Sequence, residues 1–406
     1  MRIGIDCRSI LNPAAHKGAG IAHYTYNLVK NLLAIDHDNQ YVLFFDSNVH
    51  EVLDFIEENN RIVQFPFAQY RRFMPFGYSH LLLSAIIKKA KLDLFHAPTA
   101  WRPLAYNGPT VVTAHDMAIY EHPEWFPKKQ GFSKRVVVPQ TIKTAKHIIA
   151  VSEETSRAVR TLFAVPPQKV SVIYEGAPEV PAVSAQQMQD VRDKFDIGKR
   201  FILFVGTLEP RKNVARLVRA FDELVERDSK EFMDVELVLA GGQGWNDDEI
   251  KAALRAAKSR ARIKAVGYVS EDEKWALLRG AQVFAFPTLY EGFGLGNLEA
   301  MAAGTPVVTS RLPIMREVLD KAAYLVEPTS VHDIALGLEA LLRSESLRRD
   351  YAARGREQAR QYSWRTCAEQ TLAVYQSIYK QGLREKGSQV IKGGLTGRSI
   401  SGGEKR

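Results

Sequence analysis

The chain has 406 residues, of which 46% are hydrophobic and 25% are charged. These values are typical of a folded globular protein and exclude collagen-like and disordered chains, and the length favours two domains. The only cysteines, Cys7 and Cys367, exclude a disulfide framework and favour a reducing compartment. More than half of the net charge of +9 lies in residues 380–406. The basic composition is therefore no argument for a nucleic-acid partner, and we expect none.

The sequence predicts no signal peptide and no membrane-spanning run, so we expect a cytoplasmic protein. Two segments leave open a peripheral contact with anionic lipid at the inner face of the cell membrane. Residues 71–95 mix aromatic, aliphatic and basic side chains, and residues 381–406 form a Gly/Ser-rich basic tail. The alternatives are a buried helix for the first segment and a flexible, solvated end for the second.

The first half of the chain alternates short apolar runs with amphipathic stretches. The apolar runs predict strands at 2–7, 41–45, 93–98, 109–116, 147–152 and 170–176. Apolar residues at helical spacing predict helices at 23–35 and 80–91. Alternation of strands and helices indicates a parallel sheet covered on both faces.

A proline-containing break at 177–189 predicts a linker that leads into a short helix, and the same pattern then restarts. Strands are predicted at 200–208, 233–242, 263–269, 282–288 and 305–310, and helices at 213–227, 248–260, 271–281 and within 333–379. The fold class is α/β, with two Rossmann-like, doubly wound parallel-sheet domains facing each other across a cleft. Ligands are expected at the carboxyl ends of the strands.

These patterns set the expected domain bounds. The first domain is 1–178, the linker is 179–195, the second domain is 196–361, a helix at 362–380 crosses back to the first domain, and the tail is 381–406.

A glycine-rich loop at 287–308, PTLYEGFGLGNLEAMAAGTPVV, contains the most informative pattern. Its glycines let backbone N–H groups approach an anion, and a helix predicted to begin near Asn297 adds a positive dipole end. This loop is therefore a candidate phosphate cradle. Glu291 and Glu299 flank the loop, and a carboxylate beside phosphate is useful if it faces hydroxyl groups. The alternative is that Glu299 is simply a first-turn acid favoured by the helix dipole.

A second motif, FVGTLEPRKNVARLV at 204–218, places two cations after a strand that ends at Gly206. Arg211 and Lys212 suit a diphosphate, although an exposed basic pair on a solvated surface is the alternative. Asn213 is expected to cap the following helix.

Two further motifs follow first-half strands. His115 and Asp116 end the predicted strand at 109–116. A lone histidine is more often structural than catalytic, but its position at the carboxyl end of a strand in a cleft favours a functional role. Gly18 and Gly20 open the first long helix, and Gly-x-Gly alone is weak evidence.

From the first strand to about residue 379, these motifs resemble the retaining nucleotide-sugar glycosyltransferases of family four. These enzymes have the GT-B fold and an E-x7-E motif, which matches Glu291 and Glu299. The resemblance implies that Glu291 contacts donor-sugar hydroxyls, Glu299 holds the ribose, Arg211 and Lys212 bind the diphosphate, and His115 lies beside the sugar with its backbone or imidazole near a hydroxyl. It also implies that phosphate binds on the backbone of Phe293, Gly294 and Leu295, and that Gly18 and Gly20 lie near the donor phosphate and the acceptor. Asp116 would orient the His115 loop, and Glu317 would contribute to the nucleotide pocket.

Gly296-Asn297 departs from the family pattern, which commonly has Pro after GFGL, so the donor identity stays open. The motif GTLEPRKN is similar to that of mannosyl- and rhamnosyltransferases of surface-polysaccharide assembly. This similarity favours a GDP-linked hexose as the donor, with a UDP-linked sugar as the alternative. The acceptor would be a glycan or a lipid-linked glycan bound by the first domain. The alternatives to transfer are a GT-B nucleotide-sugar epimerase or hydrolase, and a catalytically silent binding protein.

No cluster in the sequence has convincing metal-ligand spacing. Arg211, Lys212 and backbone dipoles could stabilise a leaving diphosphate directly. We therefore expect neither a metal nor another cofactor, with the nucleotide sugar as a substrate.

Overall fold

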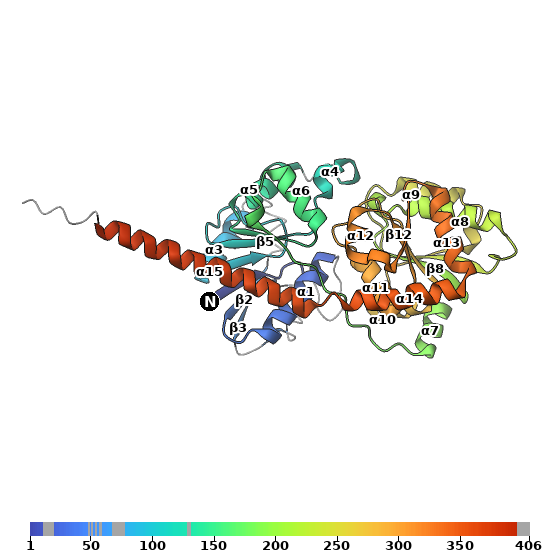
Figure 1. The fold of residues 1–406 in the computed structure, drawn as a ribbon, viewed down its shortest axis with the longest axis horizontal. Coiled ribbons are helices and arrows are strands. Elements are labelled where there is room, and N and C mark those ends of the chain that lie inside the picture. Colours follow the sequence, from blue (N-terminus) through green and yellow to red (C-terminus); the bar gives the residue numbers. More distant parts are fainter. Residues whose placement is uncertain are drawn as a thin grey trace, which may run out of the picture.

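The computed structural model describes residues 1–10, 20–47, 49, 52, 55–56, 59–66, 78–127 and 131–395. Two α/β units lie side by side, and a long C-terminal helix extends from one across the other (Figure 1). All strand pairs in the described residues are parallel. This agrees with the α/β class expected from the sequence.

The first unit is built on a seven-stranded sheet of order β3-β2-β1-β4-β5-β6-β7. Its strands are β1 (Arg2–Asp6), β2 (Gln40–Asp46), β3 (Asn60–Phe65), β4 (Leu94–Ala97), β5 (Thr110–Ala114), β6 (His147–Ala150) and β7 (Val170–Val172). Its helices are α1 (Gly20–Ile35), α3 (Leu83–Lys89), α4 (Ala118–Glu121), α5 (Val138–Thr144) and α6 (Glu153–Phe163), with short turns η2 (Tyr78–Leu82), η3 (Pro123–Trp125), η5 (Ser133–Val137) and η6 (Pro167–Lys169).

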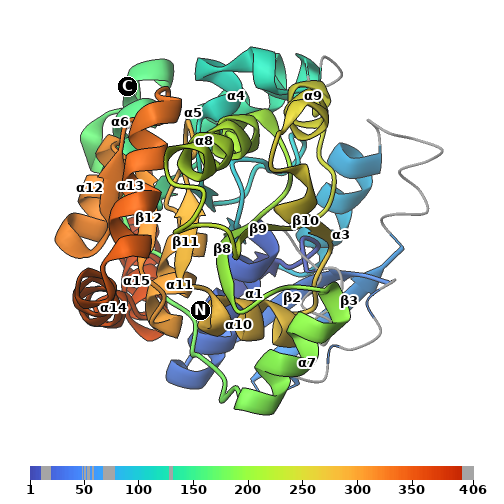
Figure 2. The ribbon, with the colours of Figure 1, turned by 90° about the vertical axis from the view of Figure 1, so that its right-hand side faces the viewer.

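The second unit has a six-stranded sheet of order β10-β9-β8-β11-β12-β13. Its strands are β8 (Arg200–Val205), β9 (Val235–Ala240), β10 (Ile263–Gly267), β11 (Val283–Phe286), β12 (Val307–Ser310) and β13 (Tyr324–Val326). Its helices are α7 (Ala185–Phe195), α8 (Val214–Arg227), α9 (Asp248–Ala256), α10 (Glu271–Gly280), α11 (Leu295–Ala303), α12 (Pro313–Leu319), α13 (Val331–Arg343) and α14 (Glu345–Arg360), with short turns η7 (Pro210–Lys212), η8 (Arg260–Arg262) and η9 (Asp320–Ala322). Helices surround the sheet on both sides in the end-on view (Figure 2).

Hydrophobic periodicity explains why the helices pack where they do. Helix α8 buries Val214, Leu217, Phe221 and Leu224, which recur at three- and four-residue spacing and therefore share one face. The central strands are buried on both faces, as the burial of every residue of β11 shows. Side chains of the central strands are therefore enclosed, and the chemistry is left to the loops after the strands.

Two strands were not predicted from the sequence. β3 is an edge strand whose residues are intermediate or exposed, so it lacks the apolar run that marks the central strands. β13 has only three residues.

The last helix, α15 (Trp364–Leu395), packs along α1 of the first unit. Tyr375 is fully buried, and its hydroxyl lies 2.5 Å from Nδ1 of His96 in β4. The helix continues through residues 381–395, which the composition predicted to be flexible tail. That expectation is wrong for this stretch, because packing of the first turns supplies the costly helix nucleus and each further residue then adds a hydrogen bond. Residues 396–406 of the expected tail lie outside the described residues.

Candidate functional site

The loop after β8 carries the two predicted cations. Arg211 and Lys212 lie in η7, and Asn213 follows in the left-handed conformation with φ of 59°. The Asn213 side chain does not cap α8, which corrects the sequence expectation. Its Nδ2 instead donates to the carbonyl oxygens of Pro287 at 2.8 Å and Pro328 at 2.7 Å. Asn213 therefore fixes the basic loop to the loop that follows β11.

Glu291 lies between the two cations. Lys212 Nζ donates to its Oε1, and an Arg211 nitrogen lies 3.4 Å from its Oε2. Arg211 also contacts Glu209 at 2.9 Å. Burial alone would raise the pKa of Glu291, but the charges of Lys212 and Arg211 outweigh it and lower that pKa. Glu291 thus partly neutralises the two cations that it faces.

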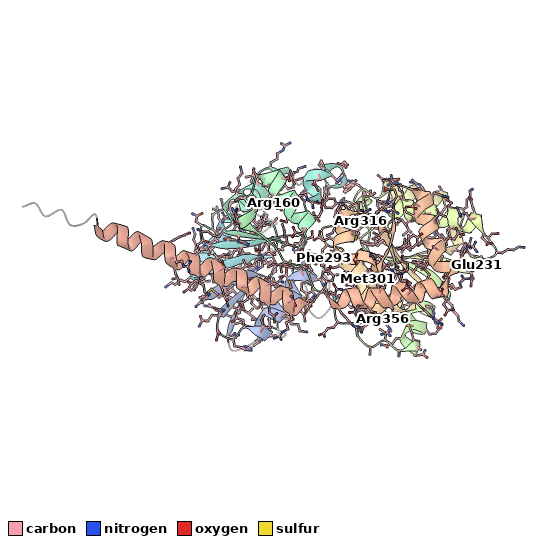
Figure 3. The ribbon with its side chains drawn as sticks, viewed as in Figure 1. Arg160, Glu231, Phe293, Met301, Arg316 and Arg356 are labelled. Atoms are coloured by element: carbon pink, nitrogen blue, oxygen red, sulfur yellow. The ribbon has the colours of Figure 1, made fainter. Side chains whose placement is uncertain are left out.

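The glycine-rich loop leads directly into a helix. Gly294 is the N-cap residue of α11 with φ of 94°, so the helix begins at Leu295, two residues before the position expected from the sequence. The backbone N–H groups of its first turn form an anion-binding end. Phe293 is buried between the units, where its ring packs against Tyr174 and Tyr362 (Figure 3).

Gly292 has no room for a side chain. A Cβ at this position would lie 1.7 Å from the carbonyl oxygen of His115 in the other unit. Only glycine allows so close an approach of the two backbones.

Glu299 lies in the second turn of α11, so it is not the first-turn helix acid that the sequence left as an alternative. Its Oε1 accepts a hydrogen bond of 2.7 Å from Lys274 Nζ, which also lies 2.9 Å from Glu271. Sequence reasoning missed Lys274, which lies on α10 and is buried. Little in the sequence indicates this role for Lys274, because SEDEK at 270–274 is typical of a capping box at a helix start. In the structure Ser270 does cap α10.

His115 follows β5, and both of its ring nitrogens have partners. Nδ1 lies 3.1 Å from Glu175 Oε1, and Nε2 lies 3.0 Å from the carbonyl oxygen of Pro98. Asp116 accepts a hydrogen bond of 3.1 Å from the backbone N–H of Ala118, two residues along the same loop. Glu175 is buried and was not singled out from the sequence, where it appears only as the acid of VIYEG.

The remaining predicted glycines lie at the ends of two elements. Gly20 is the first residue of α1. Gly206 follows β8 with φ of 155°, and a Cβ on the neighbouring Gly241 would lie 2.0 Å from its carbonyl oxygen. Gly18 lies outside the described residues.

The structure therefore places Arg211, Lys212, Glu291 and the start of α11 together on the second unit, facing His115 and Asp116 on the first. An Arg211 nitrogen lies 4.0 Å from Asp116 across this boundary. Glu299 lies on the same helix as the anion-binding end, paired with Lys274. Two acids, two cations and a helix N-terminus at one boundary suit a ligand that carries both phosphate and hydroxyl groups.

Comparison with known proteins agrees with this geometry. Residues 187–358 match the model of glycosyl transferases group 1, and residues 18–179 match that of glycosyltransferase family 4. This protein is a glycosyltransferase. The O-antigen chain mannosyltransferase B of Escherichia coli is 28% identical over 381 residues, which cover 90% of this chain and 98% of that protein.

Other relatives cover less of the chain or share the fold alone. The phosphatidyl-myo-inositol mannosyltransferase of Mycobacterium leprae (strain TN) is 36% identical over 185 residues, which cover 45% of this chain and 47% of that protein. The structure of HepE from Anabaena in complex with UDP-glucose superposes with a TM-score of 0.71 at 18% identity, covering 93% of this chain and 100% of that chain. The GT-B fold expected from the sequence is thus confirmed.

The two units of this glycosyltransferase are joined by hydrogen bonds at the N-terminus of α6. The Glu317 carboxylate on α12 accepts from the backbone N–H groups of Glu153 at 2.7 Å and Glu154 at 3.3 Å. The resemblance implies a place for Glu317 in the nucleotide pocket, and in the structure its carboxylate is bound to a helix end of the other unit. Carboxylates at such ends are stabilised by the helix dipole.

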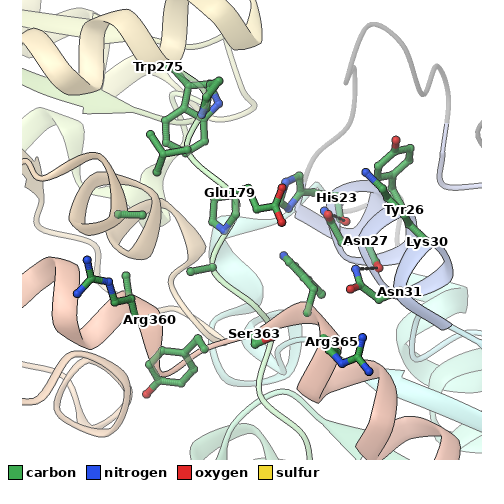
Figure 4. A pocket seen from close by; sticks show the side chains of 18 of the residues that line it. His23, Tyr26, Asn27, Lys30, Asn31, Glu179, Trp275, Arg360, Ser363 and Arg365 are labelled. Atoms are coloured by element: carbon green, nitrogen blue, oxygen red, sulfur yellow. Dashed lines mark hydrogen bonds between the residues drawn. The ribbon is translucent and has the colours of Figure 1, made fainter. Parts of the chain in front are cut away.

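A cavity of about 970 Å³ opens on the linker side of the glycosyltransferase (Figure 4). It lies between α1, the segment 177–181, α10 and the start of α15. Its walls combine Trp275 and Tyr362 with Asn27, Asn31 and Glu179. The cavity separates the two units beside the linker.

Within the described ranges, no helix of the glycosyltransferase is long and apolar enough to cross a bilayer. The same residues contain no group of three or more His, Cys, Asp or Glu side chains arranged to hold a metal ion.

Proposed function

We propose that this glycosyltransferase transfers mannose, or a similar hexose such as rhamnose, from a GDP-linked donor to a glycan or lipid-linked glycan. The observation that carries the proposal is the cluster of Arg211, Lys212 and Glu291, in which Arg211 lies 4.0 Å from Asp116 across the boundary between the units. A diphosphate would displace part of the carboxylate from the cations and occupy the N-terminus of α11. Glu291 would then be free to accept hydrogen bonds from sugar hydroxyls.

The choice of mannose is supported by relatives. The protein that covers nearly the whole chain is named a mannosyltransferase of O-antigen chains, and another relative is named a mannosyltransferase of phosphatidyl-myo-inositol. A GDP-linked donor fits this sugar, whereas the fold neighbour HepE was solved with UDP-glucose. A thermal-shift panel of GDP, UDP, ADP and dTDP tests the base, because a ligand that binds only the folded state raises its apparent stability. A rise with UDP and none with GDP would contradict the proposal.

We also propose that the donor linkage is transferred with retention and without a metal. Arg211 and Lys212 supply positive charge where the diphosphate leaves, which is the role that a metal has elsewhere. The leaving phosphate would take the acceptor proton on the same face of the sugar. Product NMR after incubation with GDP-α-mannose and an oligomannose acceptor should show the α-linkage, in the presence or absence of EDTA. A β-linked product, or loss of transfer with EDTA, would contradict the respective part.

A lipid-linked acceptor requires access to a membrane. Leu81 is 60% exposed and Leu82 is 37% exposed, and both lie on the outer side of η2. Leu83 and Ile87 of α3 are buried in the core. The segment thus packs inward and also presents apolar side chains; its residues 71–77 lie outside the described residues. We propose that this surface contacts anionic lipid. Flotation with anionic vesicles should weaken for Leu81→Glu and stay unchanged for Leu162→Glu on α6, which is 40% exposed.

A further inference from the structure

The pair formed by His115 and Glu175 is buried beside the predicted donor site. The His115 ring is 16% exposed and the Glu175 side chain is 5% exposed. The ring lies edge-on against Tyr24, with centroids 4.7 Å apart. Three elements therefore hold the ring: α1 through Tyr24, the end of β4 through Pro98, and the end of β7 through Glu175.

Counting the protons on the ring shows which charge state of His115 satisfies both contacts when Glu175 is ionised. A backbone carbonyl and an ionised carboxylate can only accept hydrogen bonds, and a neutral imidazole has a single N–H. His115 nevertheless faces Pro98 oxygen at 3.0 Å with Nε2 and Glu175 at 3.1 Å with Nδ1. Both contacts are satisfied when both ring nitrogens carry a proton. The ring is then an imidazolium, and the His115–Glu175 pair has no net charge.

We propose that Glu175 is a positioning residue that holds His115 as an imidazolium, so that the ring anchors the loop after β5 and does not exchange protons with the substrate. Both ring N–H groups are used inside the first unit, so neither is left to donate to the substrate. A neutral pair also adds no negative charge beside a diphosphate. The inference depends on the proposed function only in placing His115 next to the donor sugar.

The surrounding groups support this charge state. Other titratable groups near the pair are Tyr24, His23, His96, Cys367 and Asp116. Burial raises the pKa of Tyr24 and Cys367 and lowers that of His23, and burial together with the His115 charge lowers the pKa of His96 to about 3.

Burial would also lower the pKa of His115, but the hydrogen bond and charge of Glu175 outweigh it and raise that pKa. Asp116 adds to this effect. The environment therefore favours a cation at His115 and a neutral form of the other rings and the thiol.

The test uses the full-length, donor-free protein. The His115 imidazole signal in ¹⁵N NMR spectra is assigned by its absence from the His115→Asn variant. At pH 7 this signal should show both ring nitrogens protonated. It should titrate at a higher pH than the signal of an ordinary histidine. In Glu175→Gln, an isostere that can donate to a neutral ring, the same signal should titrate at lower pH. A neutral His115 ring at pH 7 in the unmodified protein would overturn the proposal.

Turnover gives a second readout. We expect Glu175→Gln to lower kcat by about tenfold with little change in the donor KM, and to move the alkaline limb of the pH profile to lower pH. Glu175→Asp, which keeps the charge, should recover the alkaline limb at least in part. Glu179→Gln removes an exposed carboxylate four residues away and is the matched control. An unchanged limb in Glu175→Gln, together with an unchanged titration of the His115 ring in the NMR spectra, would overturn the proposal.

Burial and the neighbouring charge of Arg211 lower the pKa of Lys212, so this amine is a second group that can shape the pH profile, and the NMR signal identifies the group responsible. Failure of the NMR test leaves mannosyl transfer by the unmodified enzyme untouched, so the two proposals fail separately.

Discussion

The hydroxyl of Ser152, at the N-terminus of α6 in the first unit, donates a hydrogen bond of 2.7 Å to the carbonyl oxygen of Gly292 in the second. Ser152 also accepts from the backbone of Thr155, so it caps its own helix and binds the other unit at once. Gly292 directly follows Glu291, the acid paired with Arg211 and Lys212. Contact between the units is therefore built into the same loop as the proposed donor site.

Gly292→Ala should disrupt this contact. The added Cβ would lie 1.7 Å from the His115 carbonyl oxygen, so the units must separate or the loop must shift. We expect kcat/KM to fall by about a hundredfold or more, since misplacement of groups by about 1 Å has such an effect. Gly242→Ala, whose Cβ meets nothing within 4 Å, is the matched control. Equal activity of the two variants would show that this close approach is dispensable.

Lys212→Ala should lower kcat/KM for the donor, because it removes a charge next to the leaving diphosphate. The expected loss of transition-state stabilisation is roughly 2–4 kcal/mol. Initial rates at subsaturating donor measure this. The variant also leaves the buried Glu291 with the Arg211 cation and the Thr288 hydroxyl, so the double variant Lys212→Met/Glu291→Gln separates folding from catalysis. It should restore thermal stability without restoring transfer. Lys258→Ala, at an exposed ion pair, serves as the surface control.

Glu317→Gln should favour separation of the units. The carboxylate accepts two backbone N–H groups at the start of α6, and an amide loses the charge-assisted part of that interaction. We expect the equilibrium between closed and open forms to shift about tenfold, equivalent to about 1.4 kcal/mol. Small-angle scattering should show a larger radius of gyration in the donor-free variant. A radius identical to that of Glu345→Gln, changed in an exposed helical ion pair, would argue against this role.

Stability should depend on pH through His115. The pKa of His115 is raised above its usual value of 6.5, chiefly because the hydrogen bond and charge of Glu175 outweigh burial. The stabilisation is fully present below the usual pKa and is lost as the pH rises through the raised one. The melting temperature of the unmodified protein should therefore exceed that of Glu175→Gln more at about pH 6 than at about pH 9. A difference that is independent of pH would contradict this.

Tyr375→Phe should loosen α15 from the first unit. The change keeps the buried ring but removes the hydroxyl that lies 2.5 Å from His96, leaving a buried polar nitrogen without this partner. Such losses cost about 1–3 kcal/mol. Urea unfolding should show a lower midpoint, while Tyr379→Phe, one turn later and partly exposed, should change little.

Much of the fold could be predicted from the sequence because buried parallel strands are continuous apolar runs. This identified every strand of both sheets except β3 at an edge and the three-residue β13. The residues expected near the donor follow those strands, and the carboxyl ends of parallel strands meet at one edge of a sheet. Arg211, Lys212 and Glu291 could thus be grouped before any coordinates were known. Their pairing with one another could not, since it depends on side-chain directions after two different strands.

The sequence by itself determined the fold class, the glycine loop and the types of residue around it, because periodicity and local backbone preferences are properties of short segments. Only the tertiary structure decided the partners: Glu175 for His115, Lys274 for Glu299, and the helix end of α6 for Glu317. These pairs are 60, 25 and about 160 residues apart along the chain. No local pattern encodes such contacts, since they arise when two sheets and the helix that crosses back pack against each other.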